Sequence, residues 1–143
     1  MSPVTAERIA AALSARSEIC AAYLFGSRAR NRATRASDVD VAVLFASPIS
    51  GDRRFELVCE ISEEVARVAG AERADVVDLE VASPLLAREV FRGGRLLFSR
   101  DEPRRVRVVA RQRMRFIDTA PMRRVLDEAV RRRLQEGRFG RLP

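Results

Sequence analysis

The chain has 143 residues, which suits one domain with a sizeable core and is too short for two. Hydrophobic residues make up 47% and charged residues 33%, a composition typical of soluble globular proteins, and no apolar run approaches the roughly 20 residues that span a bilayer. Histidine is absent, which excludes histidine-based acid–base catalysis and His-bound zinc sites.

The N-terminal residues and the cysteines indicate in which cellular compartment the protein is expected. Glu7 and Arg8 stand where a secretory signal would carry its apolar segment, so we expect no export signal and a cytoplasmic protein. Cys20 and Cys59 lack the spacing of a metal site, so we expect two buried thiols in a reducing environment.

The first half of the chain predicts two strands between two helices. A helix is expected over Thr5–Arg16, followed by a strand that ends at Phe25. The β-branched run 39–45 predicts a second strand, and residues 52–69 predict an amphipathic helix. The side chains expected on the buried face of that helix are Phe55, Val58, Ile61, Val65 and Val68.

Three further elements follow in the same alternation. A third strand is expected over residues 75–81. Ser83 is expected to cap a helix with Pro84 at its first position and Gly93-Gly94 at its end. Residues 95–99 predict a fourth strand. Alternating helices and strands imply an α/β layer around one sheet.

Two aspartates open the second strand. Side chains two residues apart in a strand point to the same face, so Asp38 and Asp40 project together while Val39 and Val41 enter the core. Two neighbouring carboxylates repel each other unless a cation lies between them. A hard divalent ion such as Mg²⁺ or Mn²⁺ suits these oxygen ligands and also binds phosphates, so the pair indicates phosphoryl or nucleotidyl transfer.

A glycine turn precedes these aspartates. Gly26 allows a sharp turn and close backbone approach to a ligand, and the Ser27 hydroxyl and the following amides can donate to phosphate oxygens. Arginines crowd the loop between turn and strand, where Arg28 and Arg30 are candidates for phosphate contacts. The same loop could also be merely a solvated charged segment.

One stretch resembles the signature of the DNA polymerase β-like nucleotidyltransferases, which is Gly-Ser, ten residues and then Asp-x-Asp. It is GSRARNRATRASDVDVAVL, residues 26–44. It is most similar to the minimal nucleotidyltransferases (MNT), and ADVVDL (residues 74–79) and GRLLF (residues 94–98) extend the resemblance. The resemblance implies an α/β polymerase β-like fold with a mixed sheet of about four strands flanked by helices. It implies one domain over 1–143, with a catalytic core at 1–103 and a helical extension at 104–143.

The resemblance also implies a function and a site. The antitoxin branch of this family adds AMP from ATP to a tyrosine of a partner HEPN-domain ribonuclease toxin and thereby silences it. The catalytic and metal-binding residues would then be Asp38, Asp40 and Asp75. The nucleotide-binding residues would be Gly26, Ser27, Arg28, Arg30 and Ser37.

The third carboxylate has two candidates in the expected third strand. Asp75 and Asp78 are an odd number of residues apart, so a straight strand sends them to opposite faces and only one can join Asp38 and Asp40. The family pattern selects Asp75, and Asp78 is then expected to face solvent at the strand end.

Two other functions fit the same sequence. One is an antitoxin that works by binding alone, with an idle site, and it predicts that Asp38→Ala leaves protection intact. The other is a nucleotidyltransferase that acts on a small molecule or on an RNA end.

The C-terminal region carries most of the positive charge. Residues 104–143 hold 13 arginines and four carboxylates, a net charge of +9, whereas residues 1–103 have a net charge of −2. Two amphipathic helices are expected, separated at Thr119-Ala120-Pro121. The apolar positions expected in the first of them are Val106, Val109, Ala110 and Ile117. The region predicts either a surface for a partner or RNA, or a solvated face on a helix packed on the sheet.

Overall fold

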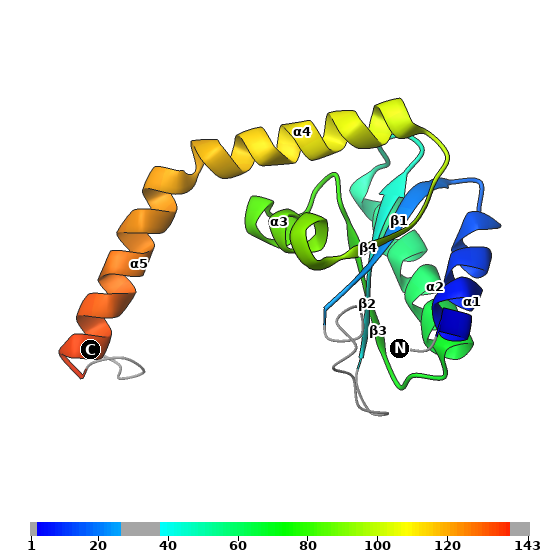
Figure 1. Cartoon of the computed structure of the whole chain (residues 1–143), viewed down its shortest axis with the longest axis horizontal. Coiled ribbons are helices and arrows are strands. Elements are labelled where there is room, and N and C mark those ends of the chain that lie inside the picture. Colours follow the sequence, from blue (N-terminus) through cyan, green and yellow to red (C-terminus); the bar gives the residue numbers. More distant parts are fainter. Residues whose placement is uncertain (1–2, 27–37, 138–143) are drawn as a thin grey trace.

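The computed structural model describes residues 3–26 and 38–137 (Figure 1). Their centre is a four-stranded sheet in the order β3-β2-β1-β4. The strands are β1 (Ile19–Phe25), β2 (Val39–Phe45), β3 (Ala74–Asp78) and β4 (Arg95–Ser99). β1 is antiparallel to both β2 and β4, whereas β2 and β3 are parallel. The predicted mixed α/β sheet is therefore confirmed.

Two helices cover one face of the sheet, as Figure 1 shows: α1 (Pro3–Ser14) and α2 (Gly51–Ala69). Alternate residues of β2 face them, because side chains in a strand alternate between the two faces. The largest core cluster lies here, and its fully buried members include Ile9, Leu13, Val39, Val41, Val43, Ile61 and Val65.

The opposite face is covered by α3 (Pro84–Gly93) and α4 (Glu102–Asp118). Tyr23, Ala42 and Val90 are members of one buried cluster there, and Leu44 and Val108 are members of another. Asp40, near the start of β2, is only half-buried. This face therefore combines a packed end with an end that holds carboxylates.

The helix ends follow the predicted capping chemistry. The Ser83 hydroxyl accepts a hydrogen bond from the Leu86 N–H, and Pro84 follows it in the first turn. Ser50 caps α2 in the same way, and Gly70 ends α2 in the left-handed conformation with φ of 64°. The predicted cap of α3 and the predicted stop of α2 are thus confirmed.

Two expectations about burial and one about the end of a strand were wrong. Phe55 is 72% exposed, and Leu57 takes its place in the core because α2 presents Leu57, Ile61 and Val65 to the sheet. Cys20 is buried, but Cys59 is exposed on α2. β3 ends at Asp78 rather than Val81, because the Asp78 carboxylate accepts the Glu80 N–H and turns the chain there.

The two C-terminal helices differ in how they meet the core. α4 buries Val108 and Gln112, whereas the expected Val106 and Ile117 are exposed. The Gln112 side-chain amide donates to the carbonyls of Leu79 and Ala82, which accounts for a polar residue in a buried position. α5 (Ala120–Gln135) begins at the predicted break and has no buried residue.

No helix in the described part of the chain is long and apolar enough to cross a membrane.

Candidate active site

Three carboxylates lie at the start of β2 and beside it. Asp40 is the register partner of Asp75 across the parallel strands β2 and β3, so the two side chains share a face of the sheet. Asp38 lies two residues before Asp40, just outside β2. Asp38 and Asp40 are half-buried and Asp75 is exposed. The pairing of β2 with β3 thus places Asp75, and not only the Asp-x-Asp pair, at this end of the sheet.

The pKa of Asp40 is affected by both of its acidic neighbours. Partial burial raises the pKa of the Asp40 carboxyl above its ordinary value, and the negative charges of Asp75 and Asp38 raise it further. A bound cation would remove both the repulsion and part of the cost of burial. The site therefore favours a positively charged ligand.

Gly26 lies directly against Asp40. It ends β1 with φ of 77°, a conformation that favours glycine. A Cβ atom added there would lie 2.2 Å from Oδ2 of Asp40. The neighbouring pair Phe25 and Asp40 holds β1 and β2 in register at this point. A glycine is therefore required for the Asp40 carboxylate to keep its position.

Asp78 belongs to the opposite face of the sheet. Its carboxylate receives a hydrogen bond from Nε of Arg54 on α2 at 3.0 Å, and the side chain is buried. Burial raises the pKa of Asp78, and the bonds from Glu80 N–H and Arg54 only partly offset that effect. The expectation that Asp78 faces solvent was wrong. Its partner on α2 makes it part of the fold rather than of the carboxylate group around Asp40.

Four of the predicted nucleotide-binding residues lie outside the described residues. They are Ser27, Arg28, Arg30 and Ser37. Gly26 is the only predicted nucleotide-binding residue within the described part of the chain, and its backbone lies next to Asp40.

The donor chemistry of the site fits a hard divalent cation. Asp38, Asp40 and Asp75 offer only oxygen donors, and Asp40 carries the repulsion that such an ion relieves. Within the described residues, no three acidic or thiol side chains are gathered closely enough to hold a metal ion as they stand. The three aspartates therefore fit a divalent cation by their negative charge and by their oxygen donors.

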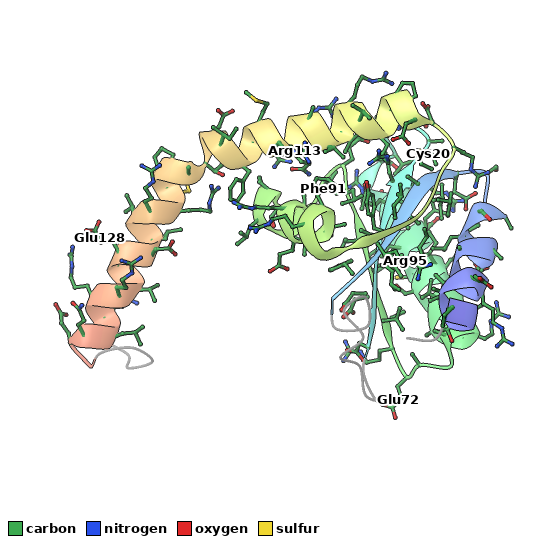
Figure 2. All side chains as sticks on the ribbon, in the orientation of Figure 1. Cys20, Glu72, Phe91, Arg95, Arg113 and Glu128 are labelled. Carbon is green, nitrogen blue, oxygen red and sulfur yellow. The ribbon has the colours of Figure 1, made fainter. Side chains whose placement is uncertain are left out.

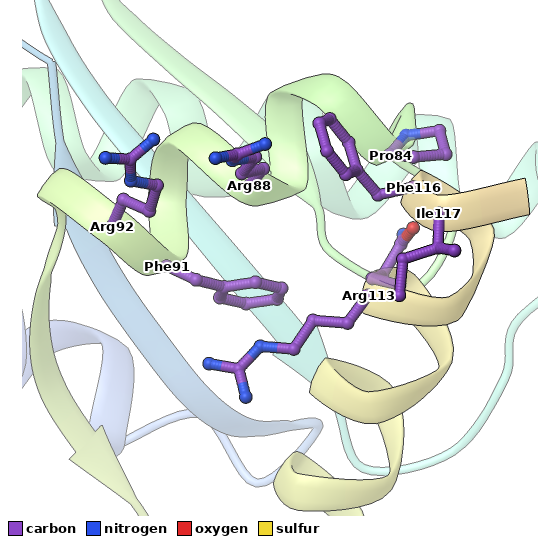
Figure 3. Close-up of a pocket in the computed structure, with 8 residues that line it drawn as sticks. Pro84, Arg88, Phe91, Arg92, Arg113, Phe116 and Ile117 are labelled. Atoms are coloured by element: carbon purple, nitrogen blue, oxygen red, sulfur yellow. The ribbon is translucent and has the colours of Figure 1, made fainter. Parts of the chain in front are cut away.

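A pocket of about 320 Å³ that the sequence did not indicate lies between α3 and α4 (Figure 3). Phe91, Phe116 and Ile117 give it apolar walls. Arg88, Arg92 and Arg113 also line it, and Arg113 projects from α4 toward Phe91 of α3. None of the three site aspartates lines this pocket. Its residues come from two helices that meet only in the fold, so no single stretch of sequence signals it.

A family model described as polymerase beta, nucleotidyltransferase matches residues 7–103. Among curated proteins, a protein adenylyltransferase named MntA from Shewanella oneidensis is 36% identical over 76 residues. That alignment covers 53% of this chain and 51% of the relative, so the matched segment spans about half of the relative's length.

Two solved structures share the fold over most of the chain. One is a toxin–antitoxin with AMP-PNP, with a TM-score of 0.68 and 24% identity, covering 87% of this chain and 98% of the matched chain. The other is a tri-AMPylated HEPN toxin of Shewanella oneidensis in complex with an MNT antitoxin. Its TM-score is 0.66 at 23% identity, and the match covers 91% of this chain and 99% of the other.

Proposed function

This chain belongs to the polymerase beta nucleotidyltransferase family, and we propose that it is an antitoxin that transfers AMP from ATP to a tyrosine hydroxyl of a cognate HEPN toxin. The observation that carries the proposal is the pairing of Asp40 with Asp75 on neighbouring strands, with Asp38 close enough to raise the pKa of Asp40. The curated relative is a protein adenylyltransferase, and similar chains occur in toxin–antitoxin structures.

The carboxylates have distinct roles in this proposal. Asp38 and Asp40 hold Mg²⁺, or Mn²⁺ in its place, with Asp75 completing the ligand set. Positive charge from an ion held there would offset the negative charge of the triphosphate oxygens and of the leaving pyrophosphate. Asp75 is the most exposed of the three, so it is the carboxylate that an incoming protein substrate can reach. It orients the tyrosine hydroxyl and accepts its proton.

The reaction is an in-line displacement at the α-phosphorus of ATP. The tyrosine oxygen forms a bond to that phosphorus, the bond from it to the bridging oxygen of the β-phosphate breaks, and pyrophosphate departs with the electron pair. The hydroxyl proton passes to a carboxylate and then to water. Positioning and charge neutralisation supply most of the rate enhancement in such a site.

The triphosphate would lie beside Gly26. Its backbone approaches the Asp40 carboxylate closely, so a phosphate bound next to Asp40 also meets the start of the following loop. We assign phosphate contacts to Ser27, Arg28, Arg30 and Ser37 as part of this proposal, on the strength of the Gly-Ser turn and the basic loop.

A labelling experiment tests the function and the site together. The purified chain, the cognate toxin and ATP labelled at the α-phosphate are incubated with Mg²⁺ or with EDTA. We expect label on the toxin only with Mg²⁺, and none with Asp38→Ala/Asp40→Ala. Asp52→Ala, an exposed aspartate on α2, is the matched control and should transfer normally.

The same experiment separates the alternatives. A toxin that is bound and inhibited without any label would replace the proposed activity by an antitoxin that acts through contact. Label that appears on RNA or on a small molecule, and never on the toxin, would place the activity on another substrate.

A further inference from the structure

Helix α5 presents a row of exposed apolar side chains. Met122, Val125, Leu126, Val130 and Leu134 are between 42% and 66% exposed, and no residue of α5 is buried. Their spacing of three or four residues places them along one side of the helix. Figure 2 shows the side chains of α5 projecting around a helix that extends away from the core. An exposed apolar row of this length on a charged helix is typical of an interaction surface.

The pocket between α3 and α4 continues this row. Ile117, at the end of α4, lines the pocket and is 61% exposed. Arg123, in the first turn of α5, lies over the Phe116 ring at 3.5 Å from its centroid, so α5 begins beside the pocket. The pocket and the α5 row thus form one surface, here called the α3–α5 surface.

The arginines of this surface lack acidic partners. Earlier in α4, Arg104 and Arg111 form ion pairs with Glu80, and Arg105 does so with Glu102. Within the described residues, no arginine from Arg113 onward forms an ion pair, and neither do Arg88 and Arg92 of α3. The α3–α5 surface is therefore apolar along its middle and carries unpaired positive charge at its borders.

The shared fold extends into this region. Residues 1–103 make up about 72% of the chain, whereas the match to the toxin–antitoxin structure with AMP-PNP covers 87%. Part of the helical extension therefore has a counterpart in that fold, although the family model itself ends at residue 103. The extension is thus an addition to the catalytic family domain, and chains from toxin–antitoxin structures share part of it.

We propose that the α3–α5 surface is where the chain binds its partner protein, through an acidic amphipathic segment of that partner. One large apolar side chain of the segment fills the pocket between Phe91 and Ile117. Carboxylates beside it pair with Arg92 and Arg113, and further apolar side chains cover the α5 row. This inference rests on the proposed function, because it takes the partner to be the cognate toxin, and it adds the surface that binds it.

The chemistry of the surface favours a protein over RNA. The exposed apolar side chains of α5 are Val, Leu and Met, which pack against apolar side chains but offer no ring for base stacking. Phe116 is a ring at the pocket, but the guanidinium groups of Arg88 and Arg123 lie over it at 4.4 Å and 3.5 Å from the centroid. Its stacking surface is thus already used.

Two double variants test the surface in the full-length chain. Leu126→Asp/Val130→Asp interrupts the apolar row at two exposed positions, and Arg92→Glu/Arg113→Glu reverses the charge at the pocket. The matched controls are Phe55→Asp, which is 72% exposed on α2, and Arg8→Glu, which is exposed on α1. Circular dichroism and thermal unfolding establish that each variant is folded.

Binding to the cognate toxin is measured by calorimetry without nucleotide, and AMP transfer is measured separately across toxin concentrations. We expect each surface variant to raise the Kd for the toxin at least about tenfold, as loss of central interface residues commonly does. The KM for the toxin should rise by a similar factor while kcat at saturating toxin is unchanged. Both controls should keep the wild-type Kd.

Failure of this inference is distinguishable from failure of the proposed function. Folded surface variants that bind the toxin with the wild-type Kd would overturn the inference, even with AMP transfer intact. Weakened binding in those variants would support it, even where the wild-type chain transfers no AMP. Loss of salt-sensitive binding to single-stranded RNA in the arginine variant, with toxin binding unchanged, would also overturn it and assign the surface to RNA.

Discussion

Asp40 and Asp75 stand directly opposite each other on the parallel strands β2 and β3. Because parallel register partners share a face, the sheet itself brings the third carboxylate to the Asp-x-Asp pair. The negative charge of Asp75 then acts on Asp40, whose pKa it raises together with burial and with Asp38. The ionised carboxylate of Asp40 therefore lowers the stability of the metal-free protein.

Replacing Asp40 by Asn should stabilise the metal-free protein and abolish its activity. The folded state raises the pKa of Asp40, so the ionised carboxylate lowers stability above that pKa and the neutral amide removes this cost. We expect a higher Tm in EDTA at pH 7. The gain should shrink as the pH falls through the raised pKa and vanish below the ordinary value of 3.8.

AMP transfer by Asp40→Asn should fall at least about a hundredfold, because even residues that only support metal ligands cost 10- to 100-fold when they are lost. Thermal unfolding at pH 7 and pH 3 provides the measurement, with Asp52→Asn on α2 as the control whose Tm should barely move. A lower Tm for Asp40→Asn at pH 7 would contradict charge repulsion between Asp40 and its two acidic neighbours.

Substitution of Asp75 should mainly affect AMP transfer, whereas substitution of Asp78 should mainly affect the free energy of unfolding. Asp75 is exposed, so Asp75→Asn should change the free energy of unfolding by no more than about 0.5 kcal/mol while AMP transfer falls strongly. Asp78→Ala removes the acceptor for Arg54 and for the Glu80 N–H, and should lower the free energy of unfolding by about 1–3 kcal/mol.

Urea unfolding and transfer assays on both variants provide the measurement. Transfer per folded molecule should survive Asp78→Ala, since Asp78 lies on the α2 face of the sheet. The opposite result, an active Asp75→Asn and an inactive but stable Asp78→Ala, would move the third carboxylate to Asp78.

Gly26→Ala should reduce AMP transfer more than Gly70→Ala does. Both glycines have positive φ, at 77° and 64°, so each substitution incurs a similar backbone strain of about 1 kcal/mol. At Gly70 nothing lies within 4 Å of the added Cβ, whereas at Gly26 it meets Oδ2 of Asp40 at 2.2 Å. We therefore expect Gly26→Ala to lose AMP transfer and Gly70→Ala to retain it.

The difference between the two glycine variants isolates the contact with Asp40. Both are followed by thermal unfolding and by AMP transfer under identical conditions. Equal activity of the two variants would mean that the Asp40 carboxylate can shift without consequence.

The strands and the carboxylate pair were predictable because local patterns determine them. The run 39–45 gave strand β2 at its observed bounds, and Ser83-Pro84 gave the start of α3. Alternation along a strand also predicted that Asp75 and Asp78 lie on opposite faces, and Asp75 shares its face with Asp40, whereas the role of Asp75 as the third carboxylate stays a prediction. These patterns depend only on residues that are close in sequence, or on the alternation of side chains between the two faces of a strand.

What could not be predicted depends on contacts between distant residues. Asp78 is buried because Arg54, 24 residues earlier, reaches it from α2. Gln112 is buried because two carbonyls near the end of β3 accept its amide, which an apolar pattern cannot indicate. The pocket between α3 and α4 likewise depends on two helices coming together, since Phe91 and Phe116 line it from different helices.

The two C-terminal helices should contribute unequally to stability. Removal of residues 119–143 should change Tm by no more than about 2 °C, because α5 has no buried residue, while toxin binding should weaken at least tenfold. Removal of residues 102–143 should lower Tm far more, since it uncovers Cys20, Ala21 and Leu44 and removes Arg104, which donates to the Phe45 carbonyl. Scanning calorimetry of both truncations and the full chain decides the matter. A large decrease in Tm on removing α5 alone would show that α5 stabilises the core. The effect of α5 on toxin binding could then not be distinguished from its effect on folding.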